Sequence, residues 1–276
     1  MTISLTGKVA LNANIDAEFG LGNKLSSYRG VAYYKPSTST IGAFDSVDLN
    51  FSEFRGTQNK VTVDLTISTN TQNYTLNPAA VSGYVANFSK VNLTINPGVY
   101  VGSASTGSYA MTITGFGAGD TINLINNGTI IGAGGNGGDS PVGGTGNNGN
   151  AGGNALLLQC PVNITNNGTI AGGGGGGGAN DGGSIYGSCT GGGGSVAGPG
   201  GGGGAGYNAG AGGSGDPSGS SGSYTAGGGG GGNGGGPGIA GDTSGSGRAG
   251  GSAGKYITGI GYANFIVSGT LLGGYS

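Results

Sequence analysis

Few residues of this sequence have the types and the spacing that catalysis requires. Two pairs of carboxylates lie close together in the chain, Asp16 with Glu18 and Asp45 with Asp48, and paired carboxylates cleave glycosidic bonds in many hydrolases. The chain contains no His and no Gly-Lys-Ser/Thr phosphate-binding loop, so the most common general base and the usual nucleotide cradle are both missing. We therefore predict that the protein is not an enzyme and has no catalytic residues, with a carboxylate pair as the remaining alternative.

Candidate metal ligands are just as few. Residues 134–139 fit the start of a calcium-binding nonapeptide, but Pro141 takes the apolar position of that motif and no tandem copy follows. The only two cysteines, Cys160 and Cys189, are too far apart for a C-x-x-C pair. We predict no metal site and no cofactor. We interpret the cysteines as separate thiols, with a disulfide formed across the glycine-rich sequence as the alternative.

The composition argues against two classes of partner. The formal net charge is −2 and only 7% of the residues are charged, whereas a nucleic-acid-binding protein needs a basic stripe or patch. No apolar run approaches the roughly 20 residues that span a bilayer, so we predict no membrane insertion. Residues 1–8 lack the charged start and apolar core of a signal peptide, so we expect synthesis in a cytoplasm.

The rest of the sequence is organised around glycine, which accounts for 74 of the 276 residues and is concentrated after Ile131. Uninterrupted runs occur at 172–178, 191–194, 200–204 and 227–232. Such composition is typical of flexible linkers. The alternative is that these segments are ordered by hydrogen bonds between backbone groups alone. In a polyproline II helix the N–H and C=O groups point sideways, and glycine helices approach closely enough to bond to one another.

Internal repeats favour the ordered alternative. Residues 122–132 are echoed by residues 162–172 and, in a degenerate form, by residues 264–274. Each copy predicts a strand, a bend and a second short strand, because Asn and Gly tolerate the positive φ of a tight bend. A flexible linker has no need of matching β anchors. We predict that the bends form a base from which glycine-rich arms leave and return.

Alternation of apolar and polar residues predicts strands before the glycine-rich part. Strands are expected at 2–11, 61–67, 74–76, 91–95, 99–101, 109–114 and 121–125, and residues 79–85 form either a short helix or a strand. The predicted domains are an attachment module (1–58), a β domain that is a sandwich or a short parallel solenoid (59–130), and a glycine-rich domain (131–276). The predicted fold class is an all-β region followed by a polyglycine II helix sandwich with β-strand anchors, with essentially no α-helix.

Short segments of different composition separate the glycine runs. They lie at 139–150, 179–190, 207–208, 214–226 and 239–248, and they hold Ser, Thr, Asn, Asp, Pro and isolated Tyr. Loops on a rigid scaffold commonly carry recognition, and this composition suits adaptable binding loops. The alternative is that they are solvated turns. The candidate contact residues are Asp139, Asn147, Asn180, Asp181, Ile185, Tyr186, Tyr207, Asn208, Asp216, Tyr224, Asp242 and Arg248.

The first 58 residues carry three linked motifs. Residues 15–21 read I-x-x-E-x-G-L, residues 25–30 read L-S-S-Y-R-G, and residues 49–56 read L-N-F-S-E-F-R-G. This pattern resembles a short module of many tailed-phage virion proteins, with Leu49 at a position where a β-branched residue is expected. The resemblance implies a role in attachment to the virion. Its candidate residues are Phe19, Tyr28, Arg29, Phe51, Phe54 and Arg55.

From about Val91 onward the chain resembles the glycine-rich adhesins at the tips of tailed-phage fibres, as in the T-even phages. The resemblance lies in the N-N-G-T-I repeats, in the segment G-S-C-T-G-G-G-G at 187–194, and in the alternation of glycine-rich blocks with distinct short segments. It implies a virion protein made in the host cytoplasm, with loops between polyglycine II helices that bind an outer-membrane protein or surface glycan.

The resemblance also implies docking on a tail-fibre or tail-tip protein. The first 58 residues match a different virion module from the one expected on a T-even adhesin, which leaves the docking partner open. Two alternatives to an adhesin follow from the residues. One is a structural virion component without a receptor, and the other is an ice-binding polyglycine II protein, against which the irregular glycine spacing argues.

Overall fold

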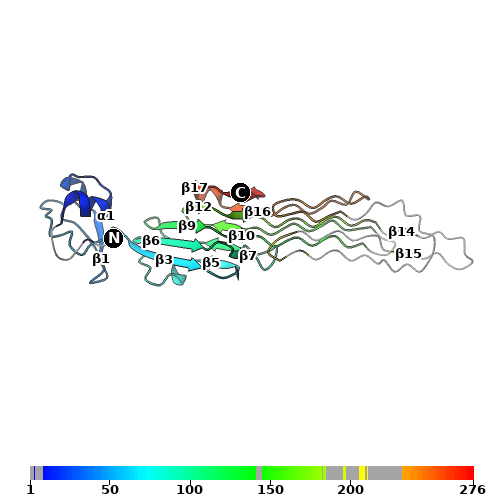
Figure 1. Ribbon diagram of the computed structural model, residues 1–276, viewed down its shortest axis with the longest axis horizontal. Helices are drawn as coiled ribbons and strands as arrows, with labels where there is room; N and C mark the ends of the chain where they lie inside the picture. Colours follow the sequence, from blue (N-terminus) through cyan, green and yellow to red (C-terminus); the bar gives the residue numbers. More distant parts are fainter. Residues whose placement is uncertain are drawn as a thin grey trace, which may run out of the picture. The chain divides into compact units, whose positions relative to one another are not determined.

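The computed structural model describes residues 3, 9–140, 145–181, 183–184, 195–196, 205–208, 210 and 232–276. The chain forms two compact units (Figure 1). The first consists of Met1–Val63, Val81–Val91 and Phe116–Thr121, and the second of Asp64–Ala80, Asn92–Gly115 and Ile122–Ser276. The predicted division into three domains stays a prediction. No helix in the described part of the chain is long and apolar enough to cross a membrane.

The first unit contains short helical turns and a two-stranded antiparallel sheet. Its elements are the π-helical turn η1 (Leu11–Asp16), α1 (Ala17–Phe19), the 3-10 turn η2 (Leu25–Tyr28), β1 (Ala32–Lys35) and β2 (Thr40–Ala43). The strand predicted over 2–11 is wrong for its described residues, because Val9 and Ala10 lie in no strand and Leu11 begins η1. Asn14 accepts the N–H of Ala10 and closes this turn at 2.8 Å. Ile15 and Phe19 then enter the core at helical spacing.

Aromatic side chains form the core of this unit. Phe19, Tyr28, Phe44 and Phe54 are buried together with Ile3, Ile15 and Leu49. The ring centroids of Phe44 and Phe54 lie 4.2 Å apart, and Phe19 meets Phe44 edge-to-face at 5.2 Å. Such ring pairs stabilise a core beyond the area that they bury, so this short segment has a core of its own.

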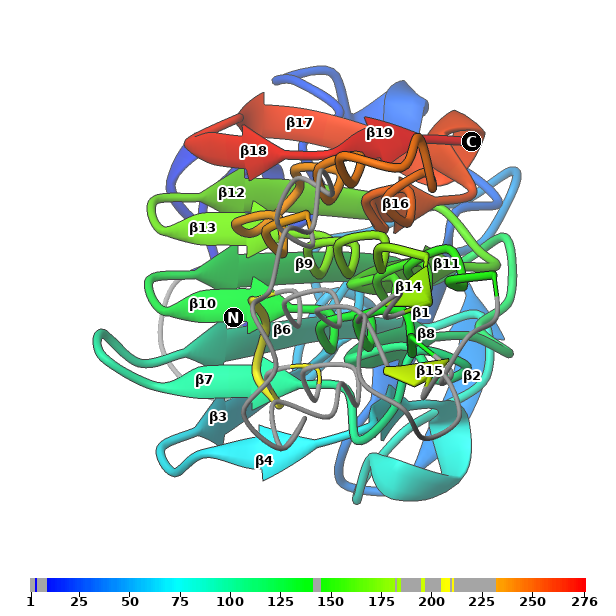
Figure 2. The same ribbon diagram turned by 90° about the vertical axis from the view of Figure 1, so that its right-hand side faces the viewer.

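The second unit contains three five-stranded parallel sheets, with strand orders β17-β12-β9-β6-β3, β18-β13-β10-β7-β4 and β19-β16-β11-β8-β5. Five successive turns of the chain each contribute one strand to each sheet, and the turns stack from β3 and β4 up to β17, β18 and β19 (Figure 2). This is a parallel solenoid, so the sandwich alternative is wrong. The last apolar strands of the sequence complete the sheets that β3, β4 and β5 begin.

The strands of this solenoid match most of the predicted positions. Their bounds are β3 Val61–Ile67, β4 Thr71–Gln72, β5 Tyr74–Leu76, β6 Ser89–Ile95, β7 Tyr100–Gly102, β8 Met111–Ile113, β9 Thr121–Asn126, β10 Thr129–Ile131, β11 Leu156–Leu158, β12 Val162–Asn166, β13 Thr169–Ala171, β16 Lys255–Thr258, β17 Ala263–Val267, β18 Thr270–Leu272 and β19 Gly274–Tyr275. The 3-10 turns η3 (Pro78–Ala80) and η4 (Ile260–Tyr262) connect strands, and β14 (Gly183–Ser184) pairs with β15 (Ser195–Val196) elsewhere.

The sequence repeats are neighbouring turns of the solenoid. Thr129 pairs with Thr169, and Thr169 pairs with Thr270, so the three copies stack in register. The predicted strand, bend and strand are confirmed in each copy, as β9–β10, β12–β13 and β17–β18. At the first two bends, the amide of Asn126 donates to the amide oxygen of Asn166 at 2.7 Å, and both side chains are fully buried.

A second ladder of amide side chains crosses all five turns on one face. Asn264 donates to Asn163, Asn163 to Asn123, Asn123 to Asn92, and Asn92 to the carboxylate of Asp64, with distances between 2.7 and 3.0 Å. Each amide offers both a donor and an acceptor, so identical residues in register satisfy one another. The ladder therefore helps to fix the register of the parallel strands.

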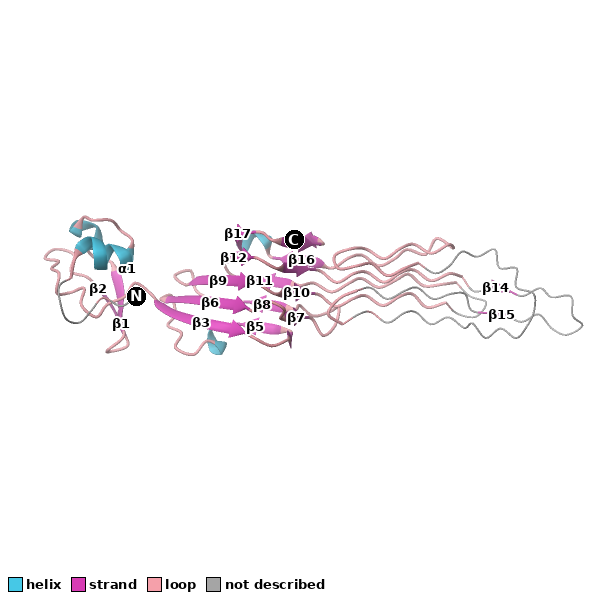
Figure 3. Cartoon of the chain, viewed as in Figure 1, coloured by secondary structure: helices cyan, strands magenta, loops and turns pink. Residues whose placement is uncertain are grey.

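The glycine-rich sequence leaves the solenoid twice, between β10 and β11 and between β13 and β16. It forms extended passes that run away from the sheets and back again (Figure 1), and Figure 3 draws them outside helix and strand. The described passes that run outward are 132–139, 172–181 and 239–243, and those that return are 146–154, 232–238 and 248–254. The predicted β base with departing and returning arms is confirmed for these passes.

Backbone hydrogen bonds join the passes at every third residue. The N–H groups of Gly173, Gly176 and Ala179 donate to the carbonyls of Gly153, Asn150 and Asn147. The carbonyls of 172, 175 and 178 accept from 238, 235 and 232, and the carbonyls of 171, 174 and 177 accept from 132, 135 and 138. Pass 172–181 thus bonds to neighbours on many sides, and its partners lie at 132–138, 147–153, 205, 232–238, 239–242 and 251–254.

This central position explains the uninterrupted run at 172–178. A Cβ built on each of these seven glycines would overlap a backbone oxygen of a neighbouring pass, such as Asn136 at Gly176 and Gly251 at Gly175. In the returning pass 146–154, the glycines whose Cβ would overlap a neighbouring backbone oxygen include Gly146, Gly149 and Gly152, which recur every three residues. Burial on all sides therefore demands glycine at every position.

Candidate functional site

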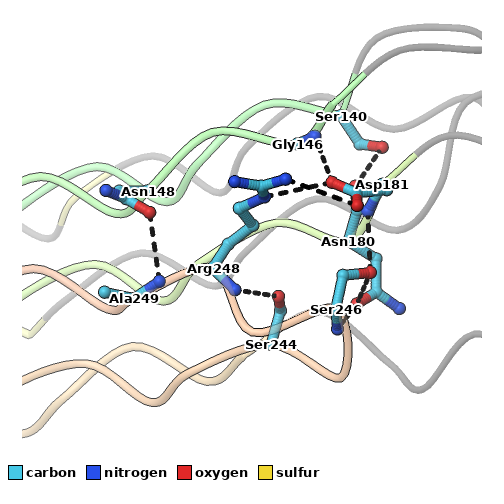
Figure 4. A network of polar contacts seen from close by, with 9 residues as sticks. All are labelled: Ser140, Gly146, Asn148, Asn180, Asp181, Ser244, Ser246, Arg248 and Ala249. Atoms are coloured by element: carbon cyan, nitrogen blue, oxygen red, sulfur yellow. Dashed lines mark hydrogen bonds and ion pairs between the residues drawn. The ribbon is translucent and has the colours of Figure 1, made fainter.

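The described passes end in two places. At the base they meet the solenoid, and at the distal end they turn back, as at 244–248. Side chains link the outward passes 132–139 and 172–181, the returning pass 146–154 and the turn at 244–248 at the distal end (Figure 4). These side chains belong to Ser140, Asn148, Asn180, Asp181, Ser244, Ser246 and Arg248. A polar cluster at this end fits the sequence, since the segments between the glycine runs hold Ser, Asn, Asp and Arg.

Asp181 and Arg248 form an ion pair at this end. Nε of Arg248 lies 3.1 Å from Oδ1 of Asp181, and Nη2 lies 3.4 Å from Oδ2. The same Oδ1 accepts the N–H of Gly146 at 2.8 Å. The hydrogen bond from Arg248, followed by that from Gly146, holds the pKa of the Asp181 carboxyl below its usual value. One carboxylate therefore joins three passes.

Asn180 makes the second link. It is buried, and its Oδ1 accepts both the N–H and the hydroxyl of Ser246, at 2.8 and 2.9 Å. Its backbone carbonyl accepts the hydroxyl of Ser140 at 2.6 Å. Among the described residues, the side-chain Nδ2 of Asn180 has no hydrogen-bond partner. Asn180 thus fixes its neighbours through its oxygen atoms.

The turn at 244–248 is closed by its own residues. The hydroxyl of Ser244 accepts the N–H of Arg248 at 3.1 Å, and its carbonyl accepts the N–H of Gly247. Gly247 has a φ of +80°, which an L-residue rarely adopts. Asp242 and Thr243, which lead into this turn, are left exposed. The turn and these two residues form a small polar surface of fixed shape.

The comparisons identify the family of this chain. The family model described as phage tail fibre adhesin Gp38 matches residues 62–276. The chain belongs to the phage tail fibre adhesin Gp38 family. Its fold is similar to the "gp37-gp38 adhesin tip complex of the bacteriophage S16 long tail fiber", a crystal structure with a TM-score of 0.51, 23% identity, and coverage of 84% of this chain and 89% of that chain. No curated protein matches the sequence.

The structure does not bring all the candidate contact residues of this adhesin together. Asp139, Asn147 and Asp242 are exposed on the distal parts of the passes, near Asn180, Asp181 and Arg248. Asn147 donates its N–H to the carbonyl of Asp139 at 2.9 Å, and Asp242 accepts from the amide of Asn233 at 3.2 Å. Four further candidates, Ile185, Tyr186, Asp216 and Tyr224, lie outside the described residues.

Tyr207 and Asn208 lie at the base of the passes. A Cβ on Gly102, the last residue of β7, would overlap the Tyr207 ring. Nδ2 of Asn208 donates to the carbonyls of Ser103 and Ala104 at 3.3 and 3.1 Å. These two residues anchor a glycine-rich segment on the solenoid, at the opposite end of the passes from Arg248.

The candidate attachment residues separate into core and surface. Phe19, Tyr28 and Phe54 are buried in the aromatic core, and Arg55 is half-buried. Arg29 and Phe51 are exposed. The aromatic residues of the motif therefore build the first unit, and Arg29 and Phe51 lie on its surface.

The carboxylates considered for catalysis bind backbone N–H groups in the first unit. Asp16 accepts the N–H of Gly22 at 2.6 Å, and Glu18 accepts that of Asn59 at 2.9 Å. Asp45 accepts from Val47 and Asp48, and these bonds lower its pKa. The bonds of Asp16 and Asp45 are local and stabilise turns, whereas Glu18 ties α1 to a residue 41 positions later in the chain.

The cysteines were predicted to be separate thiols. Cys160 is buried beside the carbonyl of Ile113, at 3.9 Å, and Cys189 lies outside the described residues, so the state of the two thiols stays a prediction.

The serines at 140, 244 and 246 belong to the distal cluster but were not among the candidates. Their signal in the sequence is the spacing S-x-S-x-R at 244–248, in which alternate residues can bond to one neighbouring pass.

Proposed function

We propose that this adhesin binds a receptor on the bacterial surface, an outer-membrane protein or a glycan, through the distal turns of its glycine-rich passes. The observation that carries the proposal is the concentration of polar side chains at that end, on passes whose inner residues are held by backbone bonds alone. Rigid presentation lowers the entropic cost of binding. Family membership gives the host-recognition role, and the turns offer polar side chains for it.

We further propose that the passes are polyglycine II helices packed side by side. The support is the recurrence of interpass bonds every third residue, since this helix has three residues per turn and no internal bonds. The neighbours of 172–181 on many sides fit such packing. Glycine is required on the inner faces because helices without side chains approach most closely.

The first unit is the proposed docking part. The family match begins at residue 62, and the first unit has its own core and exposes Arg29 and Phe51. The similar solved structure is titled as a complex of gp37 with gp38, which supports a tail-fibre protein as the partner of this chain. A tail-tip protein is the alternative partner.

A binding assay on host outer membranes tests the receptor-binding function. Purified chain is compared with a variant in which residues 179–190 and 214–226 are replaced by Gly/Ser, and circular dichroism verifies that the variant is folded. Binding by the intact chain and loss of binding by the variant support the proposal. If neither binds the membranes while both bind other virion proteins, the chain is a structural virion component.

A further inference from the structure

We infer that Asn180, Asp181 and Arg248 are positioning residues: they lock the register of the distal turns and do not themselves contact the receptor. This inference rests on the proposed receptor-binding function for its consequence, but the lock itself is a property of the free protein. The set of Asn180, Asp181, Ser246 and Arg248 is called the distal clasp below.

The need for a clasp follows from the geometry of the passes. Their backbone bonds repeat every three residues, so a pass that slides by one turn, about 9 Å at about 3.1 Å per residue, meets an equivalent set of partners. Glycine-rich elements specify register weakly for the same reason that flat strands do. The solenoid anchors passes 172–181 and 248–254 at the base, where they join β13 and β16. At the distal end the backbone bonds alone do not distinguish one register of the passes from the next, so side chains must fix it there.

The distal clasp supplies side-chain contacts that differ from one register to the next. Arg248 reaches Asp181, and Asp181 reaches Gly146, so the outward pass, its returning neighbour and the turn at 244–248 meet at one carboxylate. Asn180 adds two bonds to Ser246. A slide by three residues in any one of these passes would break the clasp contacts that this pass makes.

The side-chain oxygens of Asn180 and Asp181 are occupied within the protein, and Nδ2 of Asn180 is buried. Both oxygens of Asp181 face Arg248, and Oδ1 also accepts from Gly146 (Figure 4). The Asn180 oxygen holds two donors of Ser246. Although Asp181 and Arg248 are about two-fifths and one-third exposed, their hydrogen-bonding groups point toward one another. Receptor contact is left to exposed neighbours such as Thr243.

Exchange of the two charges distinguishes positioning from contact. Asp181→Arg and Arg248→Asp are made singly and together, with Thr243→Ala for comparison as the loss of an exposed contact, and dissociation constants are measured on host outer-membrane vesicles. Each single variant should weaken binding by about tenfold through lost preorganisation. The double variant should regain most of the affinity, because the ion pair is restored with its charges reversed. A double variant as weak as the worse single variant would overturn the inference and make these residues contacts.

A second readout needs no receptor. In the free protein, hydrogen exchange of the Ser246 amide should speed up in the single variants and slow again in the double variant. The Gly146 amide should exchange faster in both variants that lack the Asp181 carboxylate, because arginine offers no acceptor, while Gly173 and Gly176 stay protected. Unchanged exchange at Gly146 and Ser246 in the single variants would overturn the lock. If exchange behaves as expected but the wild-type chain binds no vesicles, the clasp is supported and the receptor-binding function is rejected.

Discussion

At the scale of single residues, two adjacent asparagines of one bend have opposite environments. Asn166 is fully buried, accepts from Asn126 and donates to the carbonyl of Ser268 at 2.6 Å. Asn167 is exposed and makes one side-chain bond, to Asn127 at 2.9 Å. A buried group that loses its partner costs more than an exposed one.

Replacement of these two residues tests the buried ladder. Asn166→Ala leaves buried donor and acceptor atoms unpaired and should lower the free energy of unfolding by about 2–3 kcal/mol. Asn167→Ala is the matched control and should change it by less than about 0.5 kcal/mol. Urea unfolding followed by circular dichroism measures both. Equal losses in the two variants would show that burial of the bend contributes nothing.

Protonation of Asp181 gives a prediction in pH. Hydrogen bonds from Arg248 and Gly146 lower the pKa of this carboxyl, so the clasp contributes stability above the unfolded pKa and loses it as pH falls through the lower folded pKa. The NMR shift of the Gly146 amide should therefore titrate with a midpoint below about 3.9, the usual pKa of Asp. In Asp181→Asn this titration should vanish. A midpoint at or above the usual value would contradict the geometry of the pair.

At the scale of elements, the glycine passes differ in how closely they are enclosed. Gly176→Ala would place a methyl group against the carbonyl of Asn136, in a pass surrounded by backbone. We expect it to lower the free energy of unfolding by about 3 kcal/mol, the upper range for overpacking. Gly236→Ala is the control, because its Cβ lies 3.6 Å from Ile239 and meets no backbone. It should be neutral within about 0.5 kcal/mol, as thermal unfolding can measure.

The elements show why only part of this fold could be predicted. Strict alternation at Val61–Ile67 and the N-N-G-T-I repeats identified strands and bends, because side-chain period and bend chemistry are local properties. The run at 172–178 predicted backbone-only order but not which passes surround it. At 2–11 the alternation was weak, and the cap of Asn14 on Ala10 with the burial of Ile15 and Phe19 produced a helical turn instead.

The site was predictable in its residue types and not in its arrangement. The segments between the glycine runs predicted turns, but a turn at the base and a turn at the distal end have the same kind of composition. Tyr207 was grouped with the other candidate contact residues, although it packs on Gly102 of β7. The pairing of Asp181 with Arg248 joins residues 67 positions apart, a separation that depends on the lengths of the intervening passes.

At the scale of the whole molecule, docking and receptor binding are expected to be separable. Arg29→Glu with Phe51→Ala changes exposed residues of the first unit and should reduce binding to the fibre protein at least about tenfold, the effect of a lost hot spot. Binding to host membranes should be unchanged. Pull-down on purified fibre protein and on membranes measures both. The buried control Phe54→Ala should instead destabilise the first unit by about 4 kcal/mol.

The central claim is that this adhesin meets its receptor with the distal turns of the glycine passes. Hydrogen exchange of the chain, free and bound to host outer-membrane vesicles, tests it most directly. The account predicts new protection in bound protein at 145–148, 180–181 and 243–248, with no change at 205–208 or in the strands of the solenoid. Protection at 205–208 or across the solenoid, with the distal turns unchanged, would contradict it.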